Sequence, residues 1–321
     1  MKRKLLSEII GVVGLTTFTM ALLLLTPQAF AKTVKVEMKA METEVEIDNK
    51  GTKYPAWTFD GAIPGKVVRV REGDVVDFKL VNPESNTHPH SMDFHAAEVD
   101  VLNEFAPVPP GETKHFKFKA KRPGIYMYHC GASVMAQHIA RGMYGVIIVD
   151  PKEGYSKKFP KPDREYVLVQ GQYFPDADDA QGMIKNEGWA GSLINGKMFH
   201  YDPVHDPNSK KVLEAKPGER VRIYFVNANI NETVAFHPIA GIWDKVYING
   251  NPKNTLSDIA TYNVAVSEAS TFDIVSPKGK ATNNAIVDHA MRAAMGGAIT
   301  VLMNKMDANP KLGKGDNILI R

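Results

Sequence analysis

Two short stretches of the sequence carry side chains that bind metal ions. The first contains His90, and the second contains the only cysteine of the chain, Cys130, followed by His138 and Met143. Two imidazoles, a thiolate and a weakly bound methionine form the ligand set of a type 1, electron-transferring copper site. Sulfur ligands favour Cu(I) and imidazole also suits Cu(II), so one such site serves both oxidation states. We therefore predict a type 1 copper bound by these four residues.

A second set of polar side chains lies next to the first set in the sequence. Side chains of an extended strand alternate between its two faces, so Asp93 and His95 should face away from His90. His129 and Cys130 are adjacent and should also diverge. One face then collects the type 1 ligands, and the opposite face collects two histidines and a carboxylate. Metal sites on opposite sides of the His129-Cys130 dipeptide would be joined by a short covalent path.

The second half of the chain offers a third ligand for this second site. Asp288-His289-Ala290 resembles Tyr128-His129-Cys130, so His289 takes the place of His129 and only the first half keeps a thiolate. Three imidazoles leave an open coordination position, as catalytic metal sites do. Zinc could use the same ligands. Copper is the prediction, because a neighbouring one-electron site would be of no use to a zinc ion.

The segments around these residues have the pattern of β-strands. Beyond residue 32, apolar and polar residues alternate between turns rich in Gly, Pro and Asn, as in Val67–Leu80 and Thr113–Phe118. Residues 73–82 are similar to residues 218–227, which indicates that one β-sandwich was duplicated. We predict an all-β chain with two tandem Greek-key sandwich domains, at residues 32–155 and 156–321, the second with a C-terminal tail.

The first 31 residues have the pattern of an export signal. Lys2, Arg3 and Lys4 precede an apolar run from Ile9 to Leu25, and Ala29-Phe30-Ala31 follows. A basic start, an apolar stretch and a small-x-small exit predict a signal peptide cleaved after Ala31, and hence a periplasmic or other extracytoplasmic location. The alternative is an uncleaved membrane anchor, because the apolar run is nearly long enough to span a bilayer.

Charge and cysteine content narrow the possibilities further. The formal net charge of +3 is small for 321 residues and gives no indication of a nucleic-acid partner. An exported chain with one cysteine cannot form an internal disulfide, so Cys130 is either a buried packing residue or a metal ligand. The spacing of Cys130 to His138 and Met143 favours the interpretation of Cys130 as a metal ligand.

Taken together, the motifs resemble the two-domain copper-containing nitrite reductases of the cupredoxin and multicopper oxidase superfamily. The resemblance implies two cupredoxin-like domains, a type 1 copper at His90, Cys130, His138 and Met143, and a type 2 copper at His95, His129 and His289. It also implies a homotrimer in which His289 comes from the neighbouring subunit, and a small cupredoxin or c-type cytochrome as electron donor. The resemblance covers nearly all of the chain beyond the signal. Its most specific marks are four stretches: Pro89–Ala97, Tyr128–Met143, Phe236–Gly241 and Val287–Ala290.

The same resemblance implies roles beside the type 2 copper. Asp93 and His237 resemble the proton-delivering pair of the family, Ile239 resembles the apolar residue that shapes the nitrite pocket, and Thr261 is a candidate to support His237. Reduction of nitrite to nitric oxide and water takes one electron and two protons, so proton donors must lie beside the bound anion. A histidine donates near neutral pH, and a carboxylate can relay a second proton.

Two other functions fit parts of the pattern. A laccase-like multicopper oxidase would need a larger set of His-x-His pairs, whereas the second half offers only His237 and His289 at suitable strand positions. A non-catalytic electron carrier would use the type 1 site alone. Taken singly, His237 and His289 would be interpreted as ordinary core histidines, and Asp93 as a residue that hydrogen-bonds a turn. Their positions within the motifs favour the functional interpretation of all three residues.

The remaining histidines and methionines lie outside these motifs. His115, His200 and His205 occur in polar segments and are predicted at the surface, and His88 receives no role. Met135 and Met291 are interpreted as packing residues rather than copper ligands.

Overall fold

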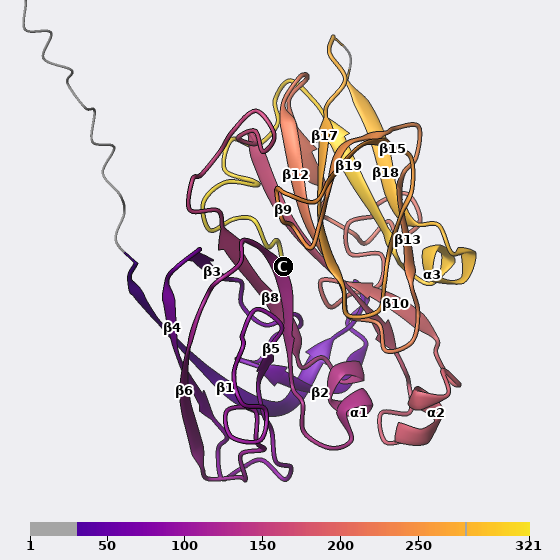
Figure 1. The fold of residues 1–321 in the computed structure, drawn as a ribbon. Coiled ribbons are helices and arrows are strands. Elements are labelled where there is room, and N and C mark those ends of the chain that lie inside the picture. The colour runs from indigo at the N-terminus through magenta and orange to yellow at the C-terminus, as the bar shows by residue number, and fades with distance from the viewer. Residues whose placement is uncertain (1–30, 280) are drawn as a thin grey trace, which may run out of the picture. The chain divides into compact units, whose positions relative to one another are not determined.

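The computed structural model describes residues 31–279 and 281–321 (Figure 1). The predicted signal peptide, apart from Ala31, lies outside the described residues. Among the described residues, no helix has the length and apolar character needed to cross a membrane.

Two four-stranded sheets form the first half of the chain. An inner strand of the first sheet, β4 (Val75–Val81), buries Val76, Phe78 and Leu80 on one face, in keeping with the alternation in the sequence. In spatial order the first sheet is β2 (Lys53–Phe59), β1 (Thr33–Glu46), β4 (Val75–Val81) and β6 (Thr113–Lys119). The second sheet is β3 (Val68–Arg71), β8 (Tyr144–Asp150), β7 (Gly124–His129) and β5 (Asp93–Phe94).

Two larger sheets form the second half. The first is β10 (Gly191–Ile194), β9 (Arg164–Tyr173), β12 (Arg220–Asn227), β17 (Ala269–Val275), β14 (Trp243–Ile248) and β15 (Thr255–Ile259). The second is β11 (Leu213–Ala215), β19 (Ile299–Asn304), β18 (Thr282–Asp288), β13 (Val234–Pro238) and β16 (Tyr262–Val264). The helices of the described residues are short: α1 (Met135–Ala140), α2 (Ala180–Ile184) and α3 (Met291–Met295). The predicted all-β fold class is confirmed.

The two halves repeat the same strand pairing. β4 runs parallel to β1 and antiparallel to β6, and β12 runs parallel to β9 and antiparallel to β17. β4 and β12 are the strands formed by the repeated residues 73–82 and 218–227. β7 leads through α1 to β8, and β18 leads through α3 to β19, so each half presents a histidine at the end of one strand. Within the described part of the chain no sheet takes strands from both halves, although the predicted boundary near residue 155 stays a prediction.

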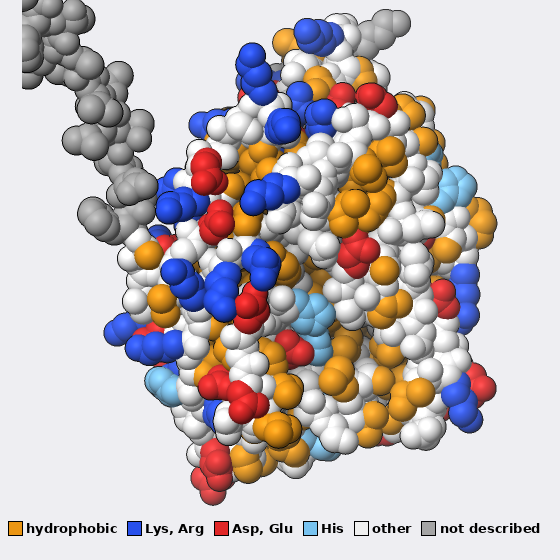
Figure 2. All heavy atoms as spheres, in the orientation of Figure 1, with side chains coloured by type: hydrophobic (Ala, Val, Ile, Leu, Met, Phe, Trp, Pro, Cys, Tyr) orange, Lys and Arg blue, Asp and Glu red, His pale blue; other side chains and the backbone are white. Residues whose placement is uncertain are grey.

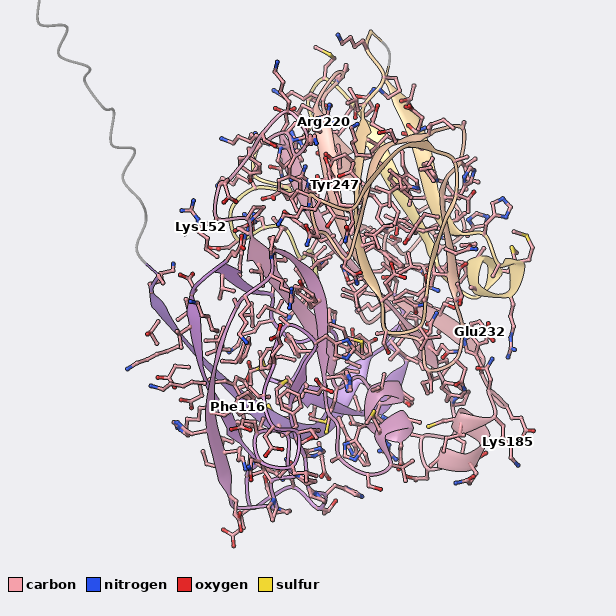
Figure 3. The ribbon with its side chains drawn as sticks, viewed as in Figure 1. Phe116, Lys152, Lys185, Arg220, Glu232 and Tyr247 are labelled. Atoms are coloured by element: carbon pink, nitrogen blue, oxygen red, sulfur yellow. The ribbon has the colours of Figure 1, made fainter. Side chains whose placement is uncertain are left out.

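A shared apolar cluster packs the halves against each other. Tyr144, Val146 and Ile148 of β8 contact a group that includes Val169 of β9 and Val226 of β12. The other face of β8 contributes to the core of the first half, where Phe116 of β6 also lies (Figure 3). Because β8 is buried on both faces, its sequence is a continuous apolar run. Each large aliphatic side chain buried here contributes roughly 1.5–3 kcal/mol.

Candidate metal centres

Three side chains of the first half converge inside the fold. His90 precedes β5, Cys130 follows β7, and His138 lies on α1. The Sγ atom of Cys130 lies 3.2 Å from Nδ1 of His138 and 4.0 Å from Nδ1 of His90, and the two Nδ1 atoms are 3.3 Å apart. All three residues are buried. We call them the thiolate cluster.

The donor atoms of the thiolate cluster suit one metal ion. Nitrogen and sulfur atoms bound to a common ion at about 2.0–2.3 Å with tetrahedral angles lie roughly 3.3–3.7 Å from one another. The distances within the cluster bracket these values. A soft sulfur with two imidazole nitrogens is a donor set that favours copper in both oxidation states.

Backbone hydrogen bonds hold the thiolate cluster in place. The backbone N–H of Ser91 donates to Cys130 Sγ at 3.2 Å. The Cys130 N–H donates to the Met143 carbonyl at 3.0 Å, and the Met143 N–H donates to the His138 carbonyl at 3.1 Å. The Met143 side chain is fully buried in the apolar cluster that also contains Cys130. These contacts bring the fourth predicted ligand to the same region.

Burial sets the protonation of the thiolate cluster. Burial lowers the pKa of His138 to about 3, assisted by the neighbouring His90, and lowers the pKa of His90 to about 4. Burial also raises the pKa of the Cys130 thiol to about 11. Both imidazoles are therefore neutral near pH 7 and able to bind a metal. The thiol must lose its proton when a metal binds.

Glu42 of β1 contacts the outer side of this cluster. Its Oε1 atom lies 3.3 Å from Nε2 of His90 and 3.1 Å from Nδ1 of His88. Burial alone would raise the pKa of Glu42, but hydrogen bonds from Thr87 and His88 outweigh it and hold that pKa below its ordinary value. Nothing in the sequence near His90 indicated Glu42, because the contact joins positions 48 residues apart.

Trp57 of β2 was also missed by the sequence analysis. Its ring centroid lies 4.6 Å from that of His138 and 4.4 Å from that of His88, and the Arg141 guanidinium lies 4.3 Å from the Trp57 ring. Trp57 is buried, whereas the His88 side chain is 47% exposed. The indole packs against both histidines of the thiolate cluster, and the His88 ring packs against the indole.

A second cluster lies on the other side of the His129-Cys130 dipeptide. His95 Nε2 and His129 Nε2 are 3.0 Å apart, and Asp93 Oδ2 is 3.8 Å from His129 Nε2. β5 and β7 bring these residues together, because Asp93 pairs with His129 in the register. Nδ1 of His129 lies 2.9 Å from the Cys130 carbonyl, so Nδ1–H donates there and Nε2 keeps its lone pair. We call this group the imidazole cluster.

The imidazole cluster is open to solvent on one side. His129 is buried, Asp93 is partly buried and His95 is exposed. The face drawn in Figure 2 has a hollow near its centre where histidine side chains lie beside an acidic one, so imidazole groups reach the surface of this molecule. Two converging nitrogen atoms with an adjacent carboxylate can hold a metal ion and leave positions for further ligands.

The second half places the other predicted residues in a separate group. The ring centroids of His237 and His289 are 5.4 Å apart. Nδ1 of His237 lies 2.7 Å from the Ala260 carbonyl and 3.2 Å from Oγ1 of Thr261, so the candidate threonine is near this ring while its supporting role stays a prediction. Ile239 is 39% exposed, and His289 is also exposed. Among the described residues of one chain, His289 is not in the group formed by Asp93, His95 and His129.

Three predictions about individual side chains are wrong. His200 is buried, with 4% exposure and its ring against Tyr201, because its segment pairs with β19 through the Tyr201–Thr300 bridge. His115 and His205 are exposed, as predicted. Met135 and Met291 are 45% and 58% exposed, so in the single chain they are not packing residues.

Comparisons with known proteins agree with the geometry. A family model described as multicopper oxidase matches residues 40–154. The copper-containing nitrite reductase of Neisseria gonorrhoeae is 37% identical over 289 residues, which cover 87% of this chain and 70% of that protein. A solved copper nitrite reductase from Nitrosomonas europaea is 54% identical with a TM-score of 0.87, over 90% of this chain and 100% of that chain. A Cu-containing nitrite reductase from Thermus scotoductus is 28% identical with a TM-score of 0.76, over 88% of this chain and 64% of that chain.

Proposed function

This chain belongs to the copper-containing nitrite reductases, and from that premise we propose how its residues reduce nitrite to nitric oxide. The protein is a copper-dependent oxidoreductase. The observation that carries the residue assignments is the separation of the neighbours His129 and Cys130 into two clusters of metal-binding side chains. An electron that arrives at the Cys130 sulfur can pass through the dipeptide to the His129 imidazole.

Each cluster has a distinct role in this proposal. When bound, copper supplies one-electron redox chemistry at the thiolate cluster and acts as Lewis acid and electron donor at the imidazole cluster. His90, Cys130, His138 and Met143 hold the type 1 ion in a buried site. His95 and His129 hold the type 2 ion at a site that nitrite can reach from solvent, since His95 is exposed.

His289 completes the type 2 site from a second copy of the chain. In one chain the described part places His289 beside His237 and outside the imidazole cluster. An exposed imidazole on one copy and an open cluster on another are complementary surfaces of a head-to-tail contact, and such a contact forms a ring when its rotation closes. A homotrimer with three equivalent type 2 sites satisfies this arrangement.

Asp93 and His237 deliver the protons that the reaction consumes. Nitrite, one electron and two protons give nitric oxide and water, so each turnover needs two protons beside the bound anion. Asp93 Oδ2 lies 3.8 Å from His129 Nε2 and so borders the site. Nδ1 of His237 is held by the Ala260 carbonyl, which leaves Nε2 free to take up and release a proton. Ile239 would limit the space available to the anion.

The cellular setting is part of the same proposal. The N-terminal signal would export the chain to the periplasm or another extracytoplasmic space. A small cupredoxin or a c-type cytochrome would then supply the electron to the thiolate cluster. Export is tested by the N-terminal sequence of the mature protein, which should begin at Lys32.

Copper counting with electron paramagnetic resonance tests the assignment. We expect two copper ions per chain with two distinct signals, and we expect nitrite to alter only the type 2 signal. Nitric oxide should form when a reductant and nitrite are added. One copper per chain with no response to nitrite would favour an electron carrier. Oxygen uptake with a phenolic donor, without nitric oxide, would favour a multicopper oxidase.

A further inference from the structure

We propose that Glu42 is a positioning residue of the thiolate cluster: its carboxylate holds the outer nitrogen of His90 and thereby lowers the reduction potential of the copper bound there. The inference rests on the proposed function, since it presumes a type 1 copper at His90, Cys130 and His138. It concerns a residue outside the predicted ligand set, on a strand remote in the sequence.

The two nitrogens of His90 face different partners. Nδ1 faces the interior, 3.3 Å from His138 Nδ1 and 4.0 Å from Cys130 Sγ. Nε2 faces Glu42 Oε1 at 3.3 Å. An imidazole that binds a metal through Nδ1 carries its proton on Nε2, and an ionised carboxylate can only accept. The contact therefore fixes both the tautomer and the orientation of the His90 ring.

Glu42 is itself held rigidly. Its Oε1 atom accepts from the backbone N–H groups of Thr87 and His88 at 2.9 and 2.8 Å, and its Oε2 atom accepts from the Thr87 hydroxyl at 2.7 Å. The Glu42 side chain is only 17% exposed. Because these bonds remove its rotamer freedom, the carboxylate stays near His90 whether or not a metal is bound.

His88 and Trp57 shield the contact from water. The His88 ring shares Oε1 of Glu42 with His90 and lies against Trp57, whose centroid is 5.7 Å from that of His90. His90 itself is 0% exposed. A charge near a buried ligand is screened less than an exposed charge, so the Glu42 carboxylate acts strongly on the metal site.

The sign of the effect follows from the charge. A carboxylate that accepts the Nε2 proton makes His90 a stronger donor, and a stronger anionic environment favours Cu(II) over Cu(I). Removal of an outer-shell partner typically weakens metal binding by about tenfold or more. If that loss falls on Cu(II), the Cu(II)/Cu(I) equilibrium shifts about tenfold toward Cu(I), which equals about 59 mV for one electron.

Redox titration of the copper-loaded Glu42→Gln protein, followed by the type 1 absorption, tests the proposal. We expect a higher potential, an altered type 1 resonance signal and an unchanged type 2 signal. Glu44→Gln is the matched control, since Glu44 is exposed on the same strand and its neutralisation should leave the potential unchanged. Thr87→Val removes one bond to Glu42 but keeps the charge near His90, so its potential should also stay near that of the wild type.

The outcomes separate this inference from the proposed function. A wild-type protein without a type 1 signal would overturn the proposed function itself. A normal wild-type signal with an unchanged potential in Glu42→Gln, or with an equal shift in Glu44→Gln, would overturn only the role of Glu42. Should Glu42→Gln fail to fold, Glu42→Asp is the second variant, because it keeps the negative charge on a shorter side chain. The reduction potential of Glu42→Asp should rise by a smaller amount. An unchanged potential in Glu42→Asp would also contradict the proposal.

Discussion

Hydrogen bonds to backbone groups fix the orientation of both side chains of the His129-Cys130 dipeptide. The His129 ring donates from Nδ1 to the Cys130 carbonyl at 2.9 Å, and Cys130 Sγ accepts from the Ser91 N–H at 3.2 Å. The two side chains are therefore oriented toward separate clusters by contacts that do not involve an ion. Such preorganisation reduces the rearrangement that accompanies each electron transfer, because ligand atoms already occupy their places.

His200 provides a pH-dependent prediction away from the copper sites. Burial, followed by Lys211 and Lys197, lowers the pKa of this imidazole to about 4. A lowered folded-state pKa gives stability that is present above the unfolded value, near pH 6.5, and is lost as the pH falls toward 4. Between pH 7.5 and pH 4.5 we expect a loss of roughly 2–3 kcal/mol from this residue.

Thermal or urea unfolding of wild type and His200→Phe at the two pH values checks the loss. Phenylalanine keeps a ring against Tyr201 but cannot take up a proton. The variant should therefore lose less stability than the wild type when the pH is lowered. Equal acid sensitivity of wild type and His200→Phe would contradict the prediction.

The sequence predicted those site residues whose placement depends on local rules. The predictions placed His90 apart from Asp93 and His95 by alternation along an extended stretch, and His129 apart from Cys130 by adjacency. The strand β5 is only Asp93–Phe94, so His90 and His95 lie just outside it, but the two groups are still separate. Glu42 could not be predicted in this way, because its contact with His90 depends on how β1 lies beside the loop before β5. His200 was misplaced for the same reason, since a polar sequence segment is buried only through its contact with a distant strand.

The strand-to-helix connections present a histidine in each half. β7 ends at His129 and is followed by α1, and β18 ends at Asp288 and is followed by His289 and α3. The Asp288 carboxylate accepts from the N–H groups of Ala235 and Ala290 at 3.1 Å and from Gln170 Nε2 at 2.8 Å. Asp288 thus ties the end of β18 to β13 and β9, and fixes the backbone from which His289 projects.

Replacement of Asp288 should therefore affect one copper site and spare the other. In Asp288→Ala the N–H groups of Ala235 and Ala290 lose their acceptor, and the His289 backbone is less well fixed. We expect type 2 copper to bind about 10–100-fold more weakly, as for other supporting residues, while the type 1 signal persists. Copper titration with spectroscopy of both sites measures this. Loss of both coppers together would indicate general unfolding and contradict the specific role.

The arrangement of the two halves follows from packing that the sequence analysis could not assign. The repeat predicted the sandwich fold, because residues 73–82 and 218–227 become the equivalent strands β4 and β12. β8 packs on both faces, with Val149 in the first-half core and Ile148 in the shared cluster. A continuous apolar run gives no information about which neighbour covers each face.

The exposure of His289 in one chain makes subunit mixing the most direct test of the assembly. His289→Ala and His95→Ala homo-oligomers should each keep the type 1 signal and lose type 2 copper and nitrite reduction. If each site combines His95 of one chain with His289 of the next, random mixing of equal amounts should restore about one quarter of the sites. Unfolding and reassembly, or co-expression, allows the chains to mix.

Two further mixtures are the controls. Mixing His289→Ala with His129→Ala should restore the same share of sites. Mixing His95→Ala with His129→Ala should restore none, because each of those sites would still lack one ligand. A mixture of His289→Ala and His95→Ala with no recovered nitrite reduction would mean that each chain builds its own site.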